Sequence, residues 1–304
     1  MNQNNDKKRR PWLAVLLSIA ATGLGHIYSG QLTKGLVLFF VSFAFAPLIV
    51  LTANYTTSAT IFIMILLSVA LTISVFLYAA ADSYRTAKQV TDFKCKSYNQ
   101  WPVYLLFIVV ALTYPTSLSA TIRDHVWQAF KIPSTSMTPG ILKGDRIFLN
   151  KAIYNLKPII RGDVVIFIYP DDRRKFFLKR IVALPGDTVS IKNNVVWVNN
   201  KPLEQHAMTQ PPKINMPLEE NMRIIEEANG DARYPILVDG DQPENMAEIT
   251  VAHGHCFVMG DNRPDSRDSR YFGTIPLADI KGRVEYVYWP ALSWKRFGRY
   301  SYQN

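Results

Sequence analysis

Three hydroxyl side chains near the middle of this 304-residue chain, Ser134, Thr135 and Ser136, could supply a nucleophile. Pro133 precedes them and a Pro-Gly pair follows at residues 139–140, which favours a rigid, turn-rich segment over a helix. Such a segment presents a hydroxyl on a fixed bend of the backbone, as nucleophilic catalysis requires. An ordinary turn rich in serine and threonine has the same composition, so the neighbouring segments must decide between the two interpretations.

A serine hydroxyl is a weak nucleophile at neutral pH and needs a base to remove its proton. Histidine is the usual base, but nothing near His253 or His255 resembles the aspartate that orients a triad histidine. The other histidines are less suited, since His26 and His125 lie in or beside an apolar N-terminal part and His206 lies in a loop-rich stretch. A lysine whose pKa is lowered towards neutrality by burial is the alternative base.

Lys179 fits that requirement. It lies in the segment 176–182, whose composition predicts a strand. Because side chains alternate with a period of two, Lys179 shares one face of this strand with Phe177 and Ile181, and that face could be desolvated. The opposing interpretation is that Lys179 and Arg180 are solvated charges on an exposed strand.

A third polar segment runs from Gly260 to Arg270 (GDNRPDSRDSR), directly after the apolar residues 257–259. Its Gly, Asp and Asn residues are turn formers, which is typical of an exposed loop. The functional interpretation is a loop that supports a site, in which hydroxyls orient the lysine ammonium and Asp–Arg pairs brace the backbone.

Short alternating runs after residue 123 predict the elements that position these segments. The predicted strands are 145–149, 163–169, 176–184, 189–192, 195–198, 256–259 and 283–288. Asn193-Asn194 between two of them is a hairpin signal. Residues 123–304 are therefore predicted to form a mostly antiparallel β domain. A loop-rich β insertion is predicted at about 190–252, because residues 201–250 are rich in Pro, Asn and acidic side chains.

The N-terminal part differs in composition. No Asp, Glu, Lys or Arg occurs in residues 11–33, 35–81 or 97–122, although the mean hydropathy of the whole chain is only +0.02. Since a helix needs about 20 apolar residues to cross a bilayer, transmembrane helices are predicted at 36–53, 60–80 and 101–118. A shorter apolar segment at 12–27, broken by glycines, is predicted to be a short interfacial or re-entrant helix. Residues 1–122 are thus interpreted as a membrane anchor.

The charge distribution predicts how this anchor is oriented. Of the formal net charge of +10, nine Lys and Arg against three Asp lie before residue 123, and 25 basic against 21 acidic residues lie from there on. The basic residues at 7–10 and in the polar loop 82–100 flank apolar runs, which indicates orientation in a bilayer rather than nucleic-acid binding. Three spans would make both segments cytoplasmic and place residues 123–304 outside. Cys95 and Cys256 would then lie on opposite sides and could not pair.

The sequence predicts no metal ion and no cofactor. It has neither a CxxC motif nor a Cys/His ligand set. His253 and His255 lie near Cys256, but no carboxylate or second cysteine in the same short run completes a ligand set.

Four ordered blocks together resemble the bacterial type I signal peptidases (leader peptidases), a family of Ser/Lys serine proteases. The blocks are PSTSMTP at 133–139 with Gly144-Asp145, RGDVV at 161–165, Lys179-Arg180 with LPGD at 184–187, and the segment 260–270. They extend over about 140 residues, and their order makes the resemblance specific. It does not cover residues 1 to about 125.

The resemblance implies residue roles. Ser136 matches the nucleophile and Lys179 the general base, while the Ser134 hydroxyl and the Ser136 amide match the oxyanion hole. Three residues of the third segment match supporting positions: Ser266 orients the lysine, and Asp268 and Arg270 form a structural pair. The family's shallow pockets, which select small side chains one and three places before the cut, match Phe130, Ile132, Met137 and Leu178.

The function implied is a membrane-bound serine endopeptidase. It would remove N-terminal signal peptides from exported preproteins after small-x-small motifs, on the outer side of the bacterial cytoplasmic membrane. Signal peptides and the lipid bilayer are the implied partners. The N-terminal helices are either only an anchor or also a contact to the export machinery or to a particular substrate.

Departures from the family pattern leave alternatives open. Ala183 stands where the family commonly has Gly, Gly140 stands where Thr is common, and a three-span anchor is unusual. One alternative is a Ser/Lys protease like the self-cleaving repressors, which are soluble, so the charge-free runs argue against it. Another is a catalytically silent membrane scaffold or binding protein that keeps the fold.

Overall fold

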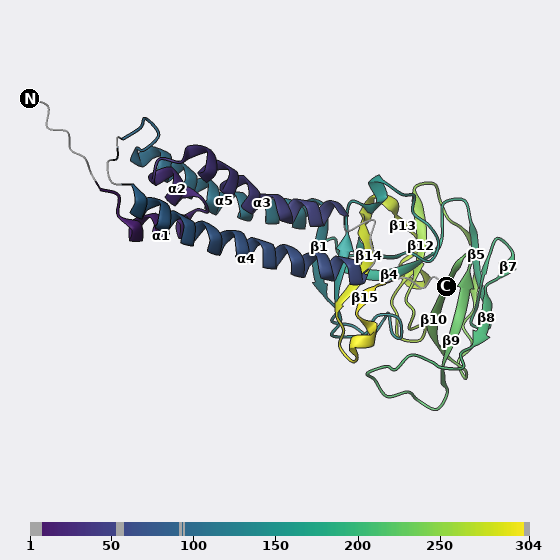
Figure 1. The fold of residues 1–304 in the computed structure, drawn as a ribbon. Coiled ribbons are helices and arrows are strands. Elements are labelled where there is room, and N and C mark those ends of the chain that lie inside the picture. Colours follow the sequence, from purple (N-terminus) through teal and green to yellow (C-terminus); the bar gives the residue numbers. More distant parts are fainter. Residues whose placement is uncertain (1–7, 53–57, 91–92, 94, 301–304) are drawn as a thin grey trace, which may run out of the picture. The chain divides into compact units, whose positions relative to one another are not determined.

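The computed structural model describes residues 8–52, 58–90, 93 and 95–300. The chain divides into two compact units, Met1–Thr121 and Ile122–Asn304. They are called the helical unit and the β unit below, and Figure 1 shows helices gathered in the first and strands in the second.

The helices of the chain's first part are α1 (Pro11–Ala20), α2 (Leu24–Tyr28), α3 (Leu32–Thr52), α4 (Ser58–Gln89) and α5 (Trp101–His125). The predicted short helix at 12–27 is thus two helices with a break between them. Gly23 in that break has a positive φ of 88°. A Cβ there would lie 2.2 Å from the carbonyl oxygen of Gly35 on α3, so only glycine permits this approach.

Two of the predicted spans are parts of longer helices. α4 continues to Gln89, so the prediction that a polar loop begins at residue 82 is wrong. α5 continues to His125 rather than ending near 118. Its Ser117 and Thr121 donate their hydroxyls to carbonyls one turn earlier, so these polar groups are satisfied within the helix. For the predicted span 36–53, residue 53 and the side chains from residue 45 on lie outside the described part.

Two described helical segments are long and apolar enough to cross a membrane, Leu66–Gln89 and Trp101–His125. Shorter apolar helical segments are Pro11–Ala20 and Leu32–Ala44. Length and composition therefore single out α4 and α5 within the described residues.

A charged cluster lies among these apolar helices. The buried imidazole of His26 on α2 places Nε2 2.7 Å from Oδ2 of Asp82 on α4. Lys34 on α3 donates from Nζ to the same oxygen at 2.6 Å. Asp82 therefore ties the polar end of α4 to α2 and α3, which explains why the helix does not end where its apolar run ends.

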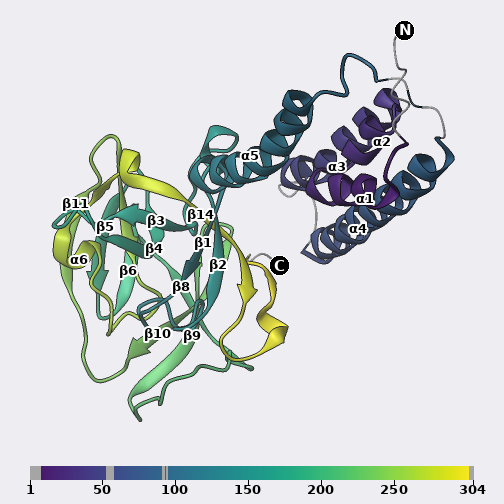
Figure 2. The same cartoon turned by 90° about the vertical axis from the view of Figure 1, so that its left-hand side faces the viewer.

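The β unit contains three antiparallel sheets (Figures 1 and 2). The largest has the order β1 (Trp127–Lys131), β2 (Arg146–Asn150), β14 (Ile280–Trp289), β3 (Val164–Ile168), β4 (Phe176–Ala183), β12 (His255–Met259) and β13 (Ile275–Pro276), with β15 (Gly298–Arg299) beside β14. The second has the order β11 (Met246–Thr250), β5 (Thr188–Lys192), β6 (Val195–Val198) and β7 (Lys201–Pro202). The third has the order β10 (Ala232–Asp239), β9 (Met222–Asn229) and β8 (Glu204–Ala207).

Each predicted strand coincides with an observed one to within a few residues. The predicted hairpin is also confirmed, because β5 and β6 pair and Asn193 and Asn194 between them both have positive φ, 49° and 66°. Two central residues with positive φ are the geometry of a tight hairpin turn.

The interpretation of residues 201–250 as loop-rich is wrong for much of its length. β9 and β10, of eight residues each, form a hairpin in which Asn229 pairs with Ala232 across Gly230-Asp231. Pro235 lies within β10, which is an edge strand of its sheet, so the missing N–H faces no partner strand. In the sequence, the proline content of this stretch predicts loops, although an edge strand also accepts proline.

Strand β4 is buried from Lys179 to Ala183, because hydrophobic clusters pack against both of its faces there. Its Ile181 packs into one hydrophobic cluster with Val165 and Phe167. Its Val182 packs into another, with Val189 and Phe257. The two polar side chains of this part of β4, Lys179 and Arg180, are therefore removed from solvent.

Candidate active site

The segment that carries Ser136 is a series of turns between β1 and β2. Its two ends meet, since Gly144 donates its backbone N–H to Ile132 O at 2.8 Å and Ile132 donates to Asp145 O at 2.9 Å. Within it, the Thr138 N–H donates to Thr135 O at 2.9 Å. The predicted rigid, turn-rich segment is confirmed, and Ser136 is half-exposed on it.

Lys179 lies against Ser136, although 43 residues separate them in the chain. Its Nζ donates to Ser136 Oγ at 2.6 Å, and the lysine is only 3% exposed. Burial lowers the pKa of Lys179 to about 8, against the opposing effect of the negative charges of Asp268 and Asp261. A lysine with such a pKa supplies a neutral amine at mildly alkaline pH. The interpretation of Lys179 and Arg180 as solvated charges is wrong.

Arg180 on the opposite face of β4 connects this strand to the loop 260–270. Its guanidinium makes two hydrogen bonds to the Asp261 carboxylate, at 2.8 and 2.7 Å, and a third to Gly162 O at 2.7 Å. Both partners of the ion pair are buried. The loop therefore begins at a fixed place beside Lys179.

The loop packs directly against the backbone of Ser136. A Cβ at Gly260 would lie 2.5 Å from Ser136 O, so this close approach requires glycine. Asn262 donates its backbone N–H to Ser136 O at 3.1 Å and its Nδ2 to Thr135 O at 3.2 Å. The segment 260–270 is thus not a free surface loop, and it holds the segment that bears the hydroxyl.

Asp268 and Arg270, expected as a pair, are in contact. Arg270 donates to both oxygens of Asp268 at 2.8 Å, and the Gly260 N–H donates to Asp268 at 2.9 Å. Burial alone would raise the pKa of Asp268, but the hydrogen bonds and charge of Arg270 lower it below the ordinary value. The carboxylate therefore stays ionised near Lys179.

Two other expected residues lie near the nucleophile in different environments. The exposed Ser134 places its Oγ 3.3 Å from Ser136 Oγ. The Ser266 hydroxyl is buried, and its interaction with Asp268 helps to lower the pKa of that carboxyl, although among the described residues no hydrogen bond of ordinary geometry reaches the hydroxyl. The expected contact between Ser266 and Lys179 is therefore not a hydrogen bond in this structure.

The four residues expected to line substrate pockets belong to a single hydrophobic cluster. Met137 and Ile132 are buried in it, at 1% and 5% exposure, while Phe130 and Leu178 are half-buried at its edge. Only the last two present substantial apolar surface to solvent.

The alternative bases lie elsewhere in the β unit. His255 on β12 contacts the backbone oxygen of the exposed His253, and His206 lies beside Glu204. The Ser136 hydroxyl makes hydrogen bonds with Lys179 and Ser134 instead. In the described ranges, no three His, Cys, Asp or Glu side chains are grouped to hold a metal ion.

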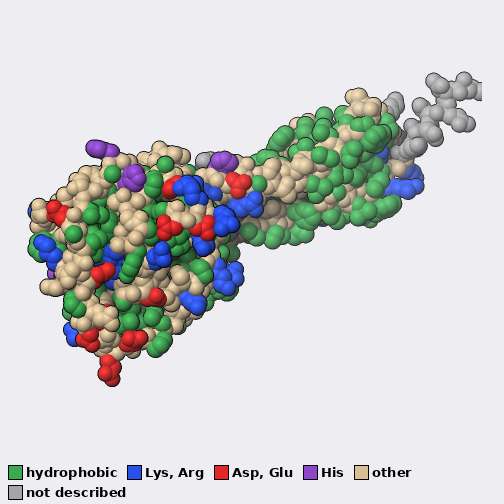
Figure 3. Space-filling view, turned by 180° about the vertical axis from the view of Figure 1, so that it is seen from behind, with side chains coloured by type: hydrophobic (Ala, Val, Ile, Leu, Met, Phe, Trp, Pro, Cys, Tyr) green, Lys and Arg blue, Asp and Glu red, His purple; other side chains and the backbone are tan. Residues whose placement is uncertain are grey.

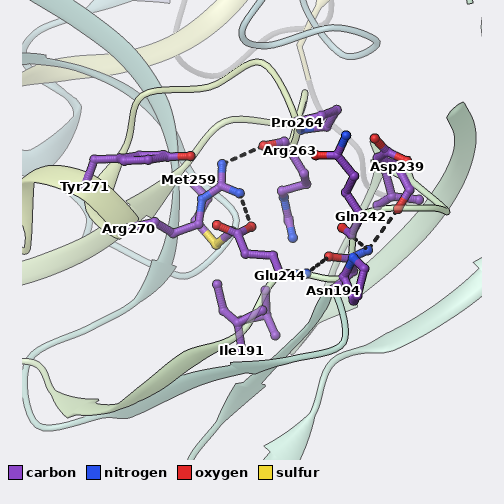
Figure 4. Close-up of a pocket in the computed structure, with 13 residues that line it drawn as sticks. Ile191, Asn194, Asp239, Gln242, Glu244, Met259, Arg263, Pro264, Arg270 and Tyr271 are labelled. Atoms are coloured by element: carbon purple, nitrogen blue, oxygen red, sulfur yellow. Dashed lines mark hydrogen bonds and ion pairs between the residues drawn. The ribbon is translucent and has the colours of Figure 1, made fainter. Parts of the chain in front are cut away.

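Sequence reasoning missed two carboxylates of the insertion that pair with arginines of the loop. Glu227 on β9 is fully buried and accepts from Arg263 at 3.1 and 2.5 Å. Glu244 pairs with Arg270 beside a cavity of about 270 Å³, and Figure 4 shows the two side chains pointing toward each other. The signal that could have found them is the pair of loop arginines, which need acidic partners if buried.

A mostly antiparallel β unit that places a buried lysine against a serine on a rigid turn defines a class of serine peptidase. Residues 100–289 match the family described as signal peptidase, peptidase S26. Because this match covers more than half of the chain, the chain belongs to that family and is a peptidase.

Individual relatives agree with the family match. The chain is 29% identical over 208 residues to the probable signal peptidase I-1 of Synechocystis sp., covering 66% of this chain and 87% of the relative. It is 32% identical over 221 residues to signal peptidase I of Aquifex aeolicus, covering 62% and 82%. It is 30% identical over 204 residues to signal peptidase I of Bacillus caldolyticus, covering 66% and 96%.

Proposed function

We propose that this chain removes N-terminal signal peptides from exported preproteins, with Ser136 as nucleophile and Lys179 as general base. The observation that carries the proposal is the 2.6 Å hydrogen bond between Lys179 Nζ and Ser136 Oγ at a lysine that is 3% exposed. The names of the relatives support the substrate class, since each is a signal peptidase I.

In the proposed mechanism, neutral Lys179 takes the proton of Ser136 Oγ as the oxygen attacks the scissile carbonyl carbon. The lysine passes this proton to the leaving amine when the C–N bond breaks, which leaves an acyl-enzyme on Ser136. Neutral Lys179 then deprotonates a water that attacks the ester, and the proton returns to Ser136 Oγ as the new C-terminal carboxylate leaves.

Residues around the dyad are proposed to support this chemistry. The Ser134 hydroxyl and the Ser136 amide would bind the oxyanion, which typically contributes a factor of about 10² to 10³. Ser266 would orient Lys179 from its buried position in the loop 260–270. Asp268, paired with Arg270, would hold the loop in place.

The surface formed by Phe130 and Leu178, backed by Ile132 and Met137, is proposed to select small residues before the cut. A surface whose interior is already filled by side chains offers little depth. A small-x-small motif fits such a surface, whereas a large side chain would have to displace the core.

The helical unit is proposed to anchor the enzyme in the bacterial cytoplasmic membrane by several passes. No described residue of α5 is buried, and Leu112 on it is 65% exposed. Figure 3 shows hydrophobic side chains over most of the visible face of this unit, with Lys and Arg at one end. Apolar surface on this scale is typical of contact with lipid. We infer that α3, α4 and α5 span, that the basic end is cytoplasmic and that the β unit is outside. The export machinery is a further proposed partner.

Cleavage of a secretory preprotein by the full-length enzyme in detergent tests the proposed activity. The wild type is expected to cut after a small-x-small motif, and Ser136→Ala and Lys179→Ala are expected to lose cleavage, while the exposed control Lys201→Ala retains it. Activity that survives in Lys179→Ala would place the base elsewhere. No cleavage by a well-folded wild type would favour the silent scaffold instead.

Reporters fused after residue 100 and after residue 123 test the topology separately. A cytoplasmic signal at the first point and an external signal at the second are expected if α5 crosses the membrane. Equal cytoplasmic signals at both points would contradict the proposed orientation.

A further inference from the structure

Asp265 connects the loop 260–270 to the residue beside the nucleophile. Thr135 donates its Oγ1 hydrogen to Asp265 Oδ2 at 2.7 Å. The same loop holds both neighbouring carbonyls through Asn262, which binds Thr135 O and Ser136 O. Asn262 therefore fixes the backbone of Thr135 and Ser136, and Asp265 fixes the side chain of Thr135.

Asp265 differs from the other acidic residues near Lys179 in its exposure and in its partners. The charged groups that act on Lys179 are Asp268, Asp261, Arg270 and Asp265. Asp268 is paired with Arg270, and Asp261 is paired with Arg180. Asp265 is exposed, and within the described part of the chain it forms no ion pair. It is thus the one carboxylate of the three that can be changed without stranding a buried arginine.

We propose that Asp265 is a positioning residue of this enzyme, which holds Ser136 at Lys179 through the hydroxyl of Thr135. This inference rests on the proposed function of Ser136 and Lys179. Its basis is a short hydrogen bond between two side chains that take no direct part in the dyad, 130 residues apart. A hydrogen bond to an ionised acceptor is stronger than one between neutral groups, so it suits a turn that must stay in one conformation.

The carboxylate has a second, electrostatic effect. A negative charge near Lys179 favours the ammonium form, so Asp265 opposes the burial that makes the lysine a base. Asp265→Asn removes the charge but keeps an oxygen that can accept from Thr135, whereas Thr135→Val removes the hydroxyl and keeps the charge. The two substitutions therefore separate positioning from electrostatics.

The experiment measures kcat and KM for preprotein cleavage across pH in Thr135→Val, Asp265→Asn and the double variant. Thr135→Val is expected to lower kcat roughly tenfold, as loss of a charge-assisted hydrogen bond would, with KM and the acid limb unchanged. Asp265→Asn is expected to lower plateau kcat less and to move the acid limb down by a few tenths of a pH unit. The double variant should be no slower at its plateau than Thr135→Val.

Matched controls are Thr250→Val and Asp231→Asn, which make the same chemical changes at exposed positions elsewhere in the β unit. Melting temperatures of all variants show whether they fold. Wild-type kcat in a folded Thr135→Val would overturn the positioning role. An acid limb in Asp265→Asn that moves no more than in Asp231→Asn would overturn the electrostatic part.

A second assay keeps the inference independent of the preprotein substrate. Acylation of Ser136 by a p-nitrophenyl ester, followed by intact mass with Ser136→Ala as background, reports the reactivity of the hydroxyl itself. A wild type that is acylated but does not cut preproteins would refute the proposed substrate and leave the Thr135 comparison valid. Equal acylation of wild type and Thr135→Val would refute the positioning role.

Discussion

Two lysines, one in each unit, make equally short contacts with opposite consequences. Lys34 in the helical unit donates to the Asp82 carboxylate at 2.6 Å, and its side chain is 40% exposed. Lys179 in the β unit donates to the Ser136 hydroxyl at the same distance and is 3% exposed. A carboxylate partner stabilises the ammonium form, whereas a hydroxyl partner in a dry site does not compensate for lost solvation. Partner and burial, rather than residue type or distance, decide which lysine can act as a base.

In the β unit the other buried cations are paired with carboxylates, and Lys179 is not. Arg180, Arg263 and Arg270 each contact at least one carboxylate. Lys179 lies near two of these carboxylates, Asp261 and Asp268, but within the described residues it is in no ion pair. Asp268 and Asp261, the two carboxylates that act on it most strongly, are engaged by Arg270 and Arg180, so they lessen the effect of burial on the lysine without cancelling it.

The largest expected effect comes from replacing each lysine by arginine. Lys179→Arg should lower kcat/KM at least about 10³-fold, because a guanidinium stays protonated and cannot remove the Ser136 proton. Lys34→Arg keeps an ion pair with Asp82 and should stay within about twofold of wild type. Preprotein cleavage by both purified variants measures this. Substantial activity in Lys179→Arg would mean that the comparison between the two lysines does not describe the chemistry.

The pH dependence of cleavage should follow the lysine of the β unit. Since the pKa of Lys179 is lowered to about 8 and its neutral form is the proposed base, kcat/KM should rise with pH and level off above that value. Below it, activity should fall about tenfold per pH unit as the ammonium form accumulates. Rate profiles from about pH 6 to 10 on a stable preprotein give the measurement. A profile that is flat over this range would exclude Lys179 as the titrating base.

A smaller effect is expected when the carboxylate partner of the first lysine is removed. Asp82→Asn leaves Lys34 and His26 without an anionic partner and should destabilise the helical unit by about 1–2 kcal/mol. The kcat of the folded enzyme should not change, because the cluster serves helix packing. Thermal unfolding in detergent, with Asp231→Asn as control, measures the stability. A loss of kcat at unchanged stability would show that the helical cluster acts on catalysis.

Much of the site was accessible from local sequence patterns. Prolines around residues 134–136 predicted the rigid turn, and the alternation around Lys179 predicted its strand and a face that could be desolvated. The ordered blocks singled out Ser136, Lys179 and the loop 260–270. The turn and strand signals are local, because turn chemistry and strand alternation act between residues that are close in the chain, whereas the blocks identified residues through the family resemblance.

Only the tertiary structure decided which partners these residues have. The contacts of Glu227 with Arg263 and of Thr135 with Asp265 join segments 36 and 130 residues apart, and no local pattern encodes such pairs. The burial of Met137, the hairpin of β9 and β10 around an edge-strand proline, and the continuation of α4 past Asp82 were misjudged or open for the same reason. The sequence by itself determined the chemistry available and the elements that carry it. The desolvation of Lys179 and the carboxylates that hold the loop depend on packing between distant segments, which only the folded chain sets.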